Sequence, residues 1–206
     1  MPGTTTIHDF LREAHVPYTI VPHRPAFTAE EEAAATHVPA RDWAKVVVCF
    51  IDGEPVEAVV PAFSKINLDR LLDLAGGRDV RMADEEELLG LFPACEVGAM
   101  PPFGPLYGQT VYVDAMLALE PEIVFNAGTH REAIAMRWND FVKIVNPIVG
   151  GLRSRLMIVS LNIGSRTARN GNKSGMVILE RKFGPYQKGW SQQGPCGLFS
   201  EGRMTL

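Results

Sequence analysis

A β-hairpin pattern in residues 43–62 constrains the fold of this chain more than any other feature. An apolar run over residues 43–51 is followed by Asp52-Gly53 and by a second β-prone run over residues 56–62. An Asp-Gly pair between two such runs predicts a two-residue turn and antiparallel pairing of the flanking strands. The first run is apolar on both of its faces, so we expect it to form a central, buried strand.

Periodicity and capping residues predict further elements around this hairpin. We expect helices over residues 5–15, 28–36, 64–75, 84–92 and 138–145, and strands over 16–21, 80–82, 110–114, 123–125 and 132–136. Residues 126–130 are expected to form a turn that ends in a histidine. The order of elements is mixed rather than a regular strand–helix alternation. It predicts an α+β fold: a single domain with a curved, mixed, largely antiparallel sheet flanked by helices.

Length and composition exclude several classes of protein. The chain has 206 residues, of which 46% are hydrophobic and 21% are charged, as expected for a soluble globular protein. No apolar run approaches the roughly 20 residues that cross a bilayer, and the N-terminus lacks the features of a signal peptide. Its three cysteines, Cys49, Cys95 and Cys196, lie far apart, which argues against a disulfide framework. These features predict a cytoplasmic protein with no membrane partner.

Charge divides the chain into two parts. Residues 1–149 hold 11 Lys and Arg against 22 Asp and Glu, a net charge of −11, whereas residues 150–206 hold 9 against 2, a net charge of +7. The second part also has 10 glycines in 57 residues. We therefore expect a folded domain over residues 1–149 and a basic, glycine-rich, disordered extension over 150–206. The alternative for the extension is a basic arm that holds nucleic-acid phosphates.

No familiar cofactor or metal motif is present. The sequence contains no GxGxxG, no Walker A loop, no HExxH and no GxSxG. Its five histidines form no HxH or HxxxH pair. We accordingly expect neither a metal nor a cofactor.

Three features remain as candidates for a site. The loop of residues 95–104 places glycines and prolines around Phe103, which suits the presentation of backbone N–H groups to a substrate but also describes an ordinary turn. Lys45 lies at the head of the first hairpin strand, where an ammonium needs a partner or a function, unless its side chain simply reaches out to solvent. His130 follows a glycine turn and could instead bond its own loop.

The order of these features resembles the YbaK/prolyl-tRNA synthetase-associated domain family of trans-acting aminoacyl-tRNA deacylases. The similarity covers residues 5–149 and rests on four segments: Ala26-Phe27-Thr28-Ala29-Glu30-Glu31, Ala44-Lys45-Val46-Val47, Gly98-Ala99-Met100-Pro101-Pro102-Phe103-Gly104 and Phe125-Asn126-Ala127-Gly128-Thr129-His130. Residues 150–206 depart from the family pattern. The resemblance implies a compact α+β fold that hydrolyses, without a metal, the ester between a noncognate amino acid and tRNA.

The resemblance also implies roles for individual residues. The essential lysine of the family corresponds to Lys45, its GxxxP loop to the segment from Gly98 to Pro102, and a histidine near the ester to His130. Catalytic roles are therefore expected for Lys45, Gly98 and His130. Substrate-binding roles are expected for Phe27, Thr28, Ala99, Met100, Pro101, Pro102, Phe103 and Gly104.

Chemistry supports the same hypothesis. Ester hydrolysis needs an attacking water and donors for the developing oxyanion, and backbone N–H groups of a glycine loop can supply those donors. Lys45 would anchor the 3′-terminal nucleotide, and His130 would orient the water or bond the terminal ribose. The expected substrates carry a small noncognate amino acid such as Ala, Ser or Thr, and the expected partners are tRNA and an aminoacyl-tRNA synthetase. The alternatives are a non-catalytic module that binds tRNA or an aminoacyl-adenylate, and a small-molecule esterase.

Overall fold

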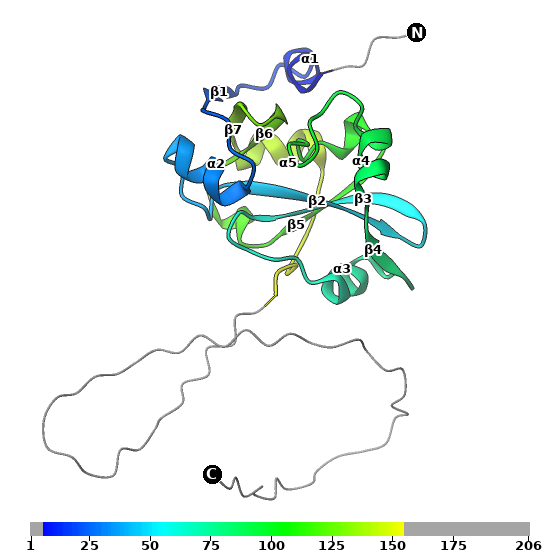
Figure 1. The fold of residues 1–206 in the computed structure, drawn as a ribbon. Coiled ribbons are helices and arrows are strands. Elements are labelled where there is room, and N and C mark those ends of the chain that lie inside the picture. The colour runs from blue at the N-terminus through cyan, green and yellow to red at the C-terminus, as the bar shows by residue number, and fades with distance from the viewer. Residues whose placement is uncertain (1–5, 155–206) are drawn as a thin grey trace, which may run out of the picture. The chain divides into compact units, whose positions relative to one another are not determined.

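The computed structural model describes residues 6–154, which form one α+β unit (Figure 1). Its helices are α1 (Ile7–Glu13), α2 (Ala29–Thr36), α3 (Leu68–Ala75), α4 (Glu85–Leu91) and α5 (Trp138–Val145), with 3-10 turns η1 (Gly104–Leu106) and η2 (Leu117–Leu119). Its strands are β1 (Thr19–Pro22), β2 (Ala44–Ile51), β3 (Glu54–Pro61), β4 (Val80–Met82), β5 (Thr110–Asp114), β6 (Glu122–Thr129), β7 (Glu132–Arg137) and β8 (Ile148–Gly150).

The predicted hairpin is confirmed as the centre of the fold. β2 and β3 pair antiparallel, with Ala44 opposite Pro61 at the open end. Asp52 and Gly53 form the turn with φ values of +51° and +90°, the left-handed backbone that a two-residue hairpin turn requires. β2 lies between β3 and β4, which confirms that the strand with two apolar faces is central.

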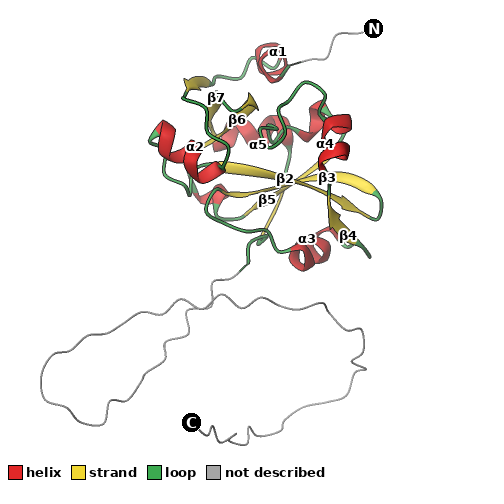
Figure 2. Ribbon diagram, in the orientation of Figure 1, coloured by secondary structure: helices red, strands yellow, loops and turns green. Residues whose placement is uncertain are grey.

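The strands form two sheets, coloured yellow in Figure 2. Five strands are arranged in the order β4-β2-β3-β5-β8, in which β5 runs parallel to both β3 and β8. The other three strands form an antiparallel sheet in the order β1-β7-β6. The predicted α+β class with largely antiparallel pairing is confirmed. The single curved sheet that we expected is divided in two, and an isolated bridge between Trp43 and Val124 links the parts.

Packing on both faces of the five-stranded sheet makes the core. On one face, side chains of β2, β3 and β5 meet α3, whose Leu71 is fully buried. On the other face, the sheet packs against α1, α5 and the three-stranded sheet, and the phenylalanines Phe103, Phe125 and Phe141 fill the interior. Burying aromatic and aliphatic side chains in this way supplies most of the stabilisation of a domain of this size.

Several element boundaries differ from the sequence prediction, and two of these differences have a local cause. The third helix begins at Leu68 rather than near residue 64, because the side chain of Asn67 accepts the N–H of Arg70 and caps the helix there. The turn predicted over residues 126–130 is wrong: β6 continues to Thr129 and the chain reverses at His130 and Arg131. β6 tolerates Gly128, at φ +99°, because its register shifts by a bulge between Asn126 and Thr129.

The folded unit extends beyond the boundary expected at residue 149. That boundary falls inside β8, which pairs with β5, and Leu152 beyond it is fully buried. The buried Asp114 carboxylate accepts the N–H groups of Leu152 and Arg153, at 2.8 and 3.2 Å, and so fixes this end of the chain. The extension expected to be disordered lies, from residue 155 onward, outside the described residues. Within residues 6–154, no helix has the length and apolar character needed to span a membrane.

Candidate active site

A cavity of about 330 Å³ opens where the head of β2 meets the start of α2 and the loop of residues 95–104. Residues from all three segments and from β6 line it: Phe27, Thr28, Ala29, Glu30, Glu32, Trp43, Ala44, Lys45, Val46, Gly98, Met100 and Asn126. Segments as far apart in the sequence as Phe27 and Asn126 therefore share one concave surface, which is the usual setting of a small-molecule site.

Lys45 supplies the cationic wall of the cavity. Its Nζ donates a hydrogen bond of 3.0 Å to the carbonyl of Ala62, the residue that follows β3. Burial lowers the pKa of Lys45, the carboxylate of Glu30 opposes this shift, and the ammonium of Lys65 adds to it. An ammonium has three donors, so the bond to Ala62 fixes the side chain and leaves two donors for a ligand.

Gly98 presents its backbone to the same cavity. Its φ of +90° is a left-handed conformation, and its N–H points to the Sδ atom of Met100 at 3.3 Å. A thioether is a weak acceptor, so an oxygen of a ligand can replace it. A Cβ at Gly98 would lie 3.4 Å from the His130 ring, at the short end of ordinary van der Waals contact.

The bulge in β6 holds this loop in place. Gly128 donates its N–H to the carbonyl of Ala99 at 3.0 Å, and its own carbonyl accepts the N–H of Glu96 at 2.8 Å. The His130 N–H donates to the Glu96 carboxylate at 2.7 Å. The irregular end of β6 is therefore the part of the fold that sets the position of Gly98.

The rest of the predicted loop faces the interior of the protein. Phe103 is fully buried and packs against the rings of Phe10, Phe125 and Phe141, with centroids 5.3–5.9 Å apart. Pro101 and Pro102 are also buried and have no N–H to offer a substrate, and Ala99 uses its own N–H to bond the carbonyl of Glu96. These residues support the loop without lining the cavity.

Gly104 also serves packing. A Cβ at this position would collide with the carbonyl of Gln109. Its N–H faces the carboxyl of Glu57 on β3, which is fully buried. Burial raises the pKa of Glu57 well above its usual value, against the opposing effect of the Gly104 N–H. Burial beneath the loop thus favours the neutral form of this carboxyl.

A buried hydrogen-bond network connects α2, β6 and the loop. Glu32 Oε1 accepts from Asn126 Nδ2 at 2.9 Å and contacts His130 Nδ1 at 2.9 Å. Asn126 uses its amino group here, and its Oδ1 is a buried acceptor with no hydrogen-bond partner among the described residues.

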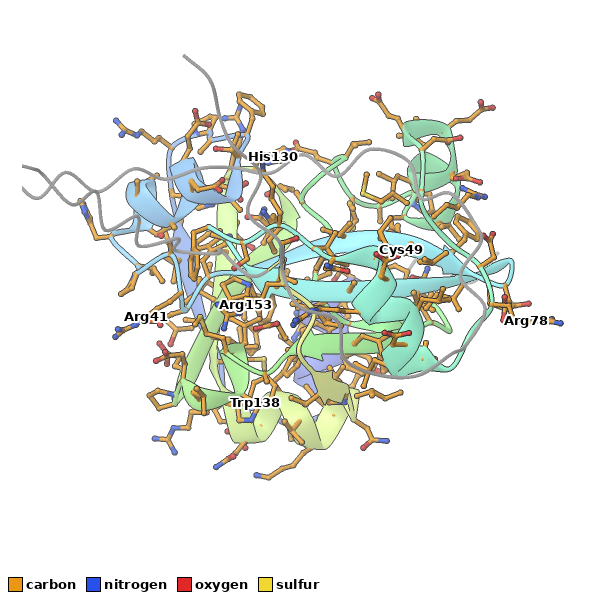
Figure 3. All side chains as sticks on the ribbon, turned by 90° about the horizontal axis from the view of Figure 1, so that it is seen from below. Arg41, Cys49, Arg78, His130, Trp138 and Arg153 are labelled. Carbon is orange, nitrogen blue, oxygen red and sulfur yellow. The ribbon has the colours of Figure 1, made fainter. Side chains whose placement is uncertain are left out.

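His130 has both ring nitrogens engaged. Nδ1 contacts the Glu32 carboxylate and Nε2 contacts the carbonyl of Val97, both at 2.9 Å. The Val97 carbonyl can only accept and a Glu32 carboxylate also accepts, so this geometry favours the imidazolium, in which both nitrogens donate. Burial lowers the pKa of His130, but the hydrogen bonds to Glu32 and Val97 outweigh it and the net shift is upward. In Figure 3 the ring lies beside the α2 ribbon, away from Trp138 on α5.

Five of the predicted site residues line the cavity together: Phe27, Thr28, Lys45, Gly98 and Met100. Thr28 also caps α2, since its hydroxyl accepts the N–H of Glu31. Phe27 lies at the rim with 74% of its surface exposed and its ring centroid 5.3 Å from that of His130. His130, Ala99, Pro101, Pro102, Phe103 and Gly104 lie outside the lining.

Sequence reasoning missed three polar residues of the site, Asn126, Glu30 and Glu32. Asn126 carried a signal, because a single amide inside the apolar run of residues 123–127 needs a buried partner. Glu32 carried none, since it lies in an acidic first turn like Glu30 and Glu31, where helix dipoles favour such residues. Across residues 6–154, no group of three or more His, Cys, Asp or Glu side chains converges as metal ligands would.

A family model described as an aminoacyl-tRNA editing domain matches residues 23–144 of the chain. This range is more than half of the protein and contains every residue that lines the cavity. The chain belongs to the aminoacyl-tRNA editing domain family. Membership confirms the resemblance to YbaK-like proteins and supports a role in editing. A search of the curated proteins found no match.

Solved structures share the fold of this editing domain at low sequence identity. The hypothetical protein APE2540 is 19% identical, with a TM-score of 0.66 over 72% of this chain and 99% of its own. A candidate trans-editing enzyme for prolyl-tRNA synthetase is 23% identical, with a TM-score of 0.63 over 75% of this chain and 99% of its own. A scaffold from computational epitope grafting is 21% identical, with a TM-score of 0.64 over 76% and 99%. At these identities the similarity establishes the fold alone.

Proposed function

We propose that this protein is a trans-editing deacylase that hydrolyses the ester bond of mischarged aminoacyl-tRNA. The observation that carries this proposal is that the Lys45 ammonium and the Gly98 N–H line one cavity in an aminoacyl-tRNA editing domain. The reaction needs a group that holds the terminal nucleotide of the tRNA and a donor that stabilises the oxyanion. The cation of Lys45 can meet the first need and the backbone N–H of Gly98 the second.

Water is the proposed nucleophile, and no metal takes part. As water attacks the ester carbonyl, the developing oxyanion displaces the Met100 thioether and accepts the Gly98 N–H. Collapse of the intermediate breaks the bond to the 3′ oxygen, which leaves with a proton. The net reaction adds one water across the ester. Lys45 holds the terminal nucleotide so that the carbonyl faces Gly98.

His130 is proposed as a positioning residue rather than a base. An imidazolium with both N–H groups donated to Glu32 and Val97 has no lone pair with which to accept a proton from water. Its ring instead links Glu32 on α2 to the carbonyl of Val97 in the loop, and in this way it would fix the position of Gly98 in the cavity wall.

The proposed substrates carry a small noncognate amino acid such as Ala, Ser or Thr. Met100 and Trp43 are buried side chains in the cavity wall and limit the space beside Gly98. Size exclusion of this kind discriminates modestly, by about 1–3 kcal/mol per methylene. The proposed setting is the cytoplasm, with tRNA and a synthetase, such as the prolyl enzyme, as partners.

Deacylation of tRNA mischarged with Ala, Ser or Thr tests the proposal, with the full chain as enzyme. Lys45→Ala is expected to lower kcat/KM by about 100-fold, the usual cost of losing one charged or oxyanion contact. Lys143→Ala is the matched control, because that lysine is exposed on α5 and paired with Asp140. Equal rates for wild type and Lys45→Ala would remove Lys45 from the mechanism.

Two other outcomes would select a different function. Binding of tRNA without deacylation of any mischarged species would indicate a non-catalytic binding module. Hydrolysis of simple aminoacyl esters at the same rate as aminoacyl-tRNA would indicate a small-molecule esterase.

A further inference from the structure

The turn that follows β3 is tied directly to the cavity lysine. Ser64 donates its N–H to the carbonyl of Pro61 at 2.8 Å and closes the turn. The carbonyl of Ala62, inside this turn, accepts the hydrogen bond from Lys45 Nζ. Ala62 and Ser64 are buried, so the turn has a defined position relative to the cavity.

Phe63, between these two buried residues, is turned outward. It exposes 45% of its surface. A single exposed phenylalanine is ordinary on a protein surface. Phe63 differs because it lies between two lysine contacts. Ala62, which precedes it, accepts the hydrogen bond of Lys45, and Lys65 follows it by two residues.

Two lysines meet at this turn. Lys65 is exposed, and its charge lowers the pKa of Lys45, whereas the Glu30 carboxylate raises it. Residues 1–149 as a whole hold 11 Lys and Arg against 22 Asp and Glu. Two lysines beside one carboxylate therefore make the turn more basic than the domain around it.

An exposed aromatic face beside lysines is the arrangement that binds single-stranded nucleic acid. Bases stack on the ring whatever their identity, and the ammonium groups meet the phosphates between them. A duplex would expose no base face to the ring, so the partner that fits is an unpaired strand.

We propose that the turn of residues 61–65 is a nucleotide subsite for the single-stranded 3′ end of tRNA, with Phe63 stacked on a base and Lys65 paired with a phosphate. This inference rests on the proposed function, since it names where the nucleotides next to the ester lie. Lys45 holds the terminal nucleotide, and the turn holds a neighbouring one.

Binding of uncharged RNA tests the subsite without requiring hydrolysis. The probe is a fluorescently labelled acceptor-stem hairpin that ends in single-stranded CCA, measured by anisotropy between 50 and 200 mM salt. Phe63→Ala is expected to weaken binding about 10-fold, within the range of one lost base stack, whereas Phe63→Trp retains it. Lys65→Ala is expected to reduce the slope of log K against log salt by about 0.7, the value for one phosphate contact on a single strand.

Matched controls separate the subsite from general surface effects. Leu119→Ala removes an apolar side chain that is 81% exposed outside the cavity, and Lys143→Ala removes an exposed lysine. Both are expected to bind like wild type. A hairpin without the CCA end should bind wild type and Phe63→Ala equally. In deacylation, Phe63→Ala is expected to raise KM while kcat is retained.

The results distinguish this inference from the proposed function. If wild type deacylates mischarged tRNA and Phe63→Ala and Lys65→Ala bind the CCA hairpin as wild type does, the subsite is overturned and the function stands. If no tRNA is deacylated but Phe63→Ala still loses CCA-dependent binding, the subsite stands and the deacylase proposal fails. Absence of any binding of the hairpin by wild type overturns the subsite.

Discussion

At the scale of single residues, the cavity depends on Lys45 and Gly98, whose positions are fixed by hydrogen bonds to neighbouring residues. Lys45 is fixed by the carbonyl of Ala62, and Gly98 is fixed by a loop that bonds to the bulge in β6. Their position in the sequence left both open, as an ordinary turn and a solvent-facing lysine, and the resemblance to the family predicted both as site residues. It also predicted Phe103 as a pocket residue, but the ring is in the core, because a large aromatic gains more by burial than a loop gains by presenting it.

Replacing Gly98 tests whether the loop requires bare backbone. Gly98→Ala places a Cβ 3.4 Å from His130 and strains a φ of +90°. We expect deacylation to fall about 100-fold while the domain remains folded, since one oxyanion donor is displaced. The measurement is kcat for deacylation together with thermal unfolding.

Gly53→Ala is the matched control for that variant. Gly53 has the same φ of +90° and open space around it, but it lies in the β2–β3 turn. It should lose about 1 kcal/mol of stability from the strained backbone and keep its activity. Equal activity in the two variants would show that Gly98 is only a turn residue.

The protonation of His130 gives a prediction for pH. Its pKa is raised in the folded protein above the unfolded value of 6.5. The stabilisation from the Glu32–His130 pair is therefore fully present below pH 6.5 and is lost as pH rises through the folded pKa. We expect NMR titration of the ring to give a pKa above 6.5, and Glu32→Gln to lower it.

Chemical unfolding between pH 5.5 and 9 provides the stability measurement. Wild type should lose more stability over this range than His130→Gln, which cannot titrate. His37→Asn is the control, because His37 is exposed at the left-handed C-cap of α2, a position that asparagine tolerates. A ring pKa below 6.5 would restore His130 as a candidate base.

At the scale of secondary structure, local signals predicted most of the elements. β4, β5 and α5 have the bounds that the sequence predicts, since their patterns and end residues lie within the segment itself. β8 was missed because three residues after Pro147 carry no periodicity, and the strand exists only through its parallel pairing with β5. The bulge in β6 was taken for a turn because glycine and asparagine favour both.

The missed C-terminal segment makes a testable contribution to stability. Leu152 is fully buried, so Leu152→Ala is expected to lower the free energy of unfolding by about 2–5 kcal/mol, as large-to-small core substitutions do. Leu119→Ala, in which an exposed leucine is shortened, is expected to change it by less than about 0.5 kcal/mol. Equilibrium unfolding in urea compares the two. Equal losses would mean that the folded unit ends at the expected residue 149.

At the scale of the whole molecule, the distribution of charge constrains the proposed binding of RNA. Residues 1–149 carry a net charge of −11 and repel phosphates at long range, so the proposed binding would depend on local cations such as Lys45 and Lys65. We expect deletion of residues 155–206 to leave the salt dependence of CCA-hairpin binding unchanged. Lys65→Ala is the comparison variant, which is expected to make that dependence shallower. A shallower salt slope after the deletion would instead establish the extension as a basic arm.

The sequence by itself determined the central hairpin, because its turn and both strands are adjacent in the chain. It also determined the α+β class and the family, because the order of elements and motifs is a property of the chain itself. Asp52-Gly53 specifies its turn whatever surrounds it, and the lysine and glycine motifs mark the editing domain. Only the tertiary structure decided what the motifs do. The charge on His130 depends on Glu32, 98 residues away, and on the carbonyl of Val97. Whether a side chain titrates, lines a cavity or fills the core depends on such distant neighbours, which local sequence does not encode.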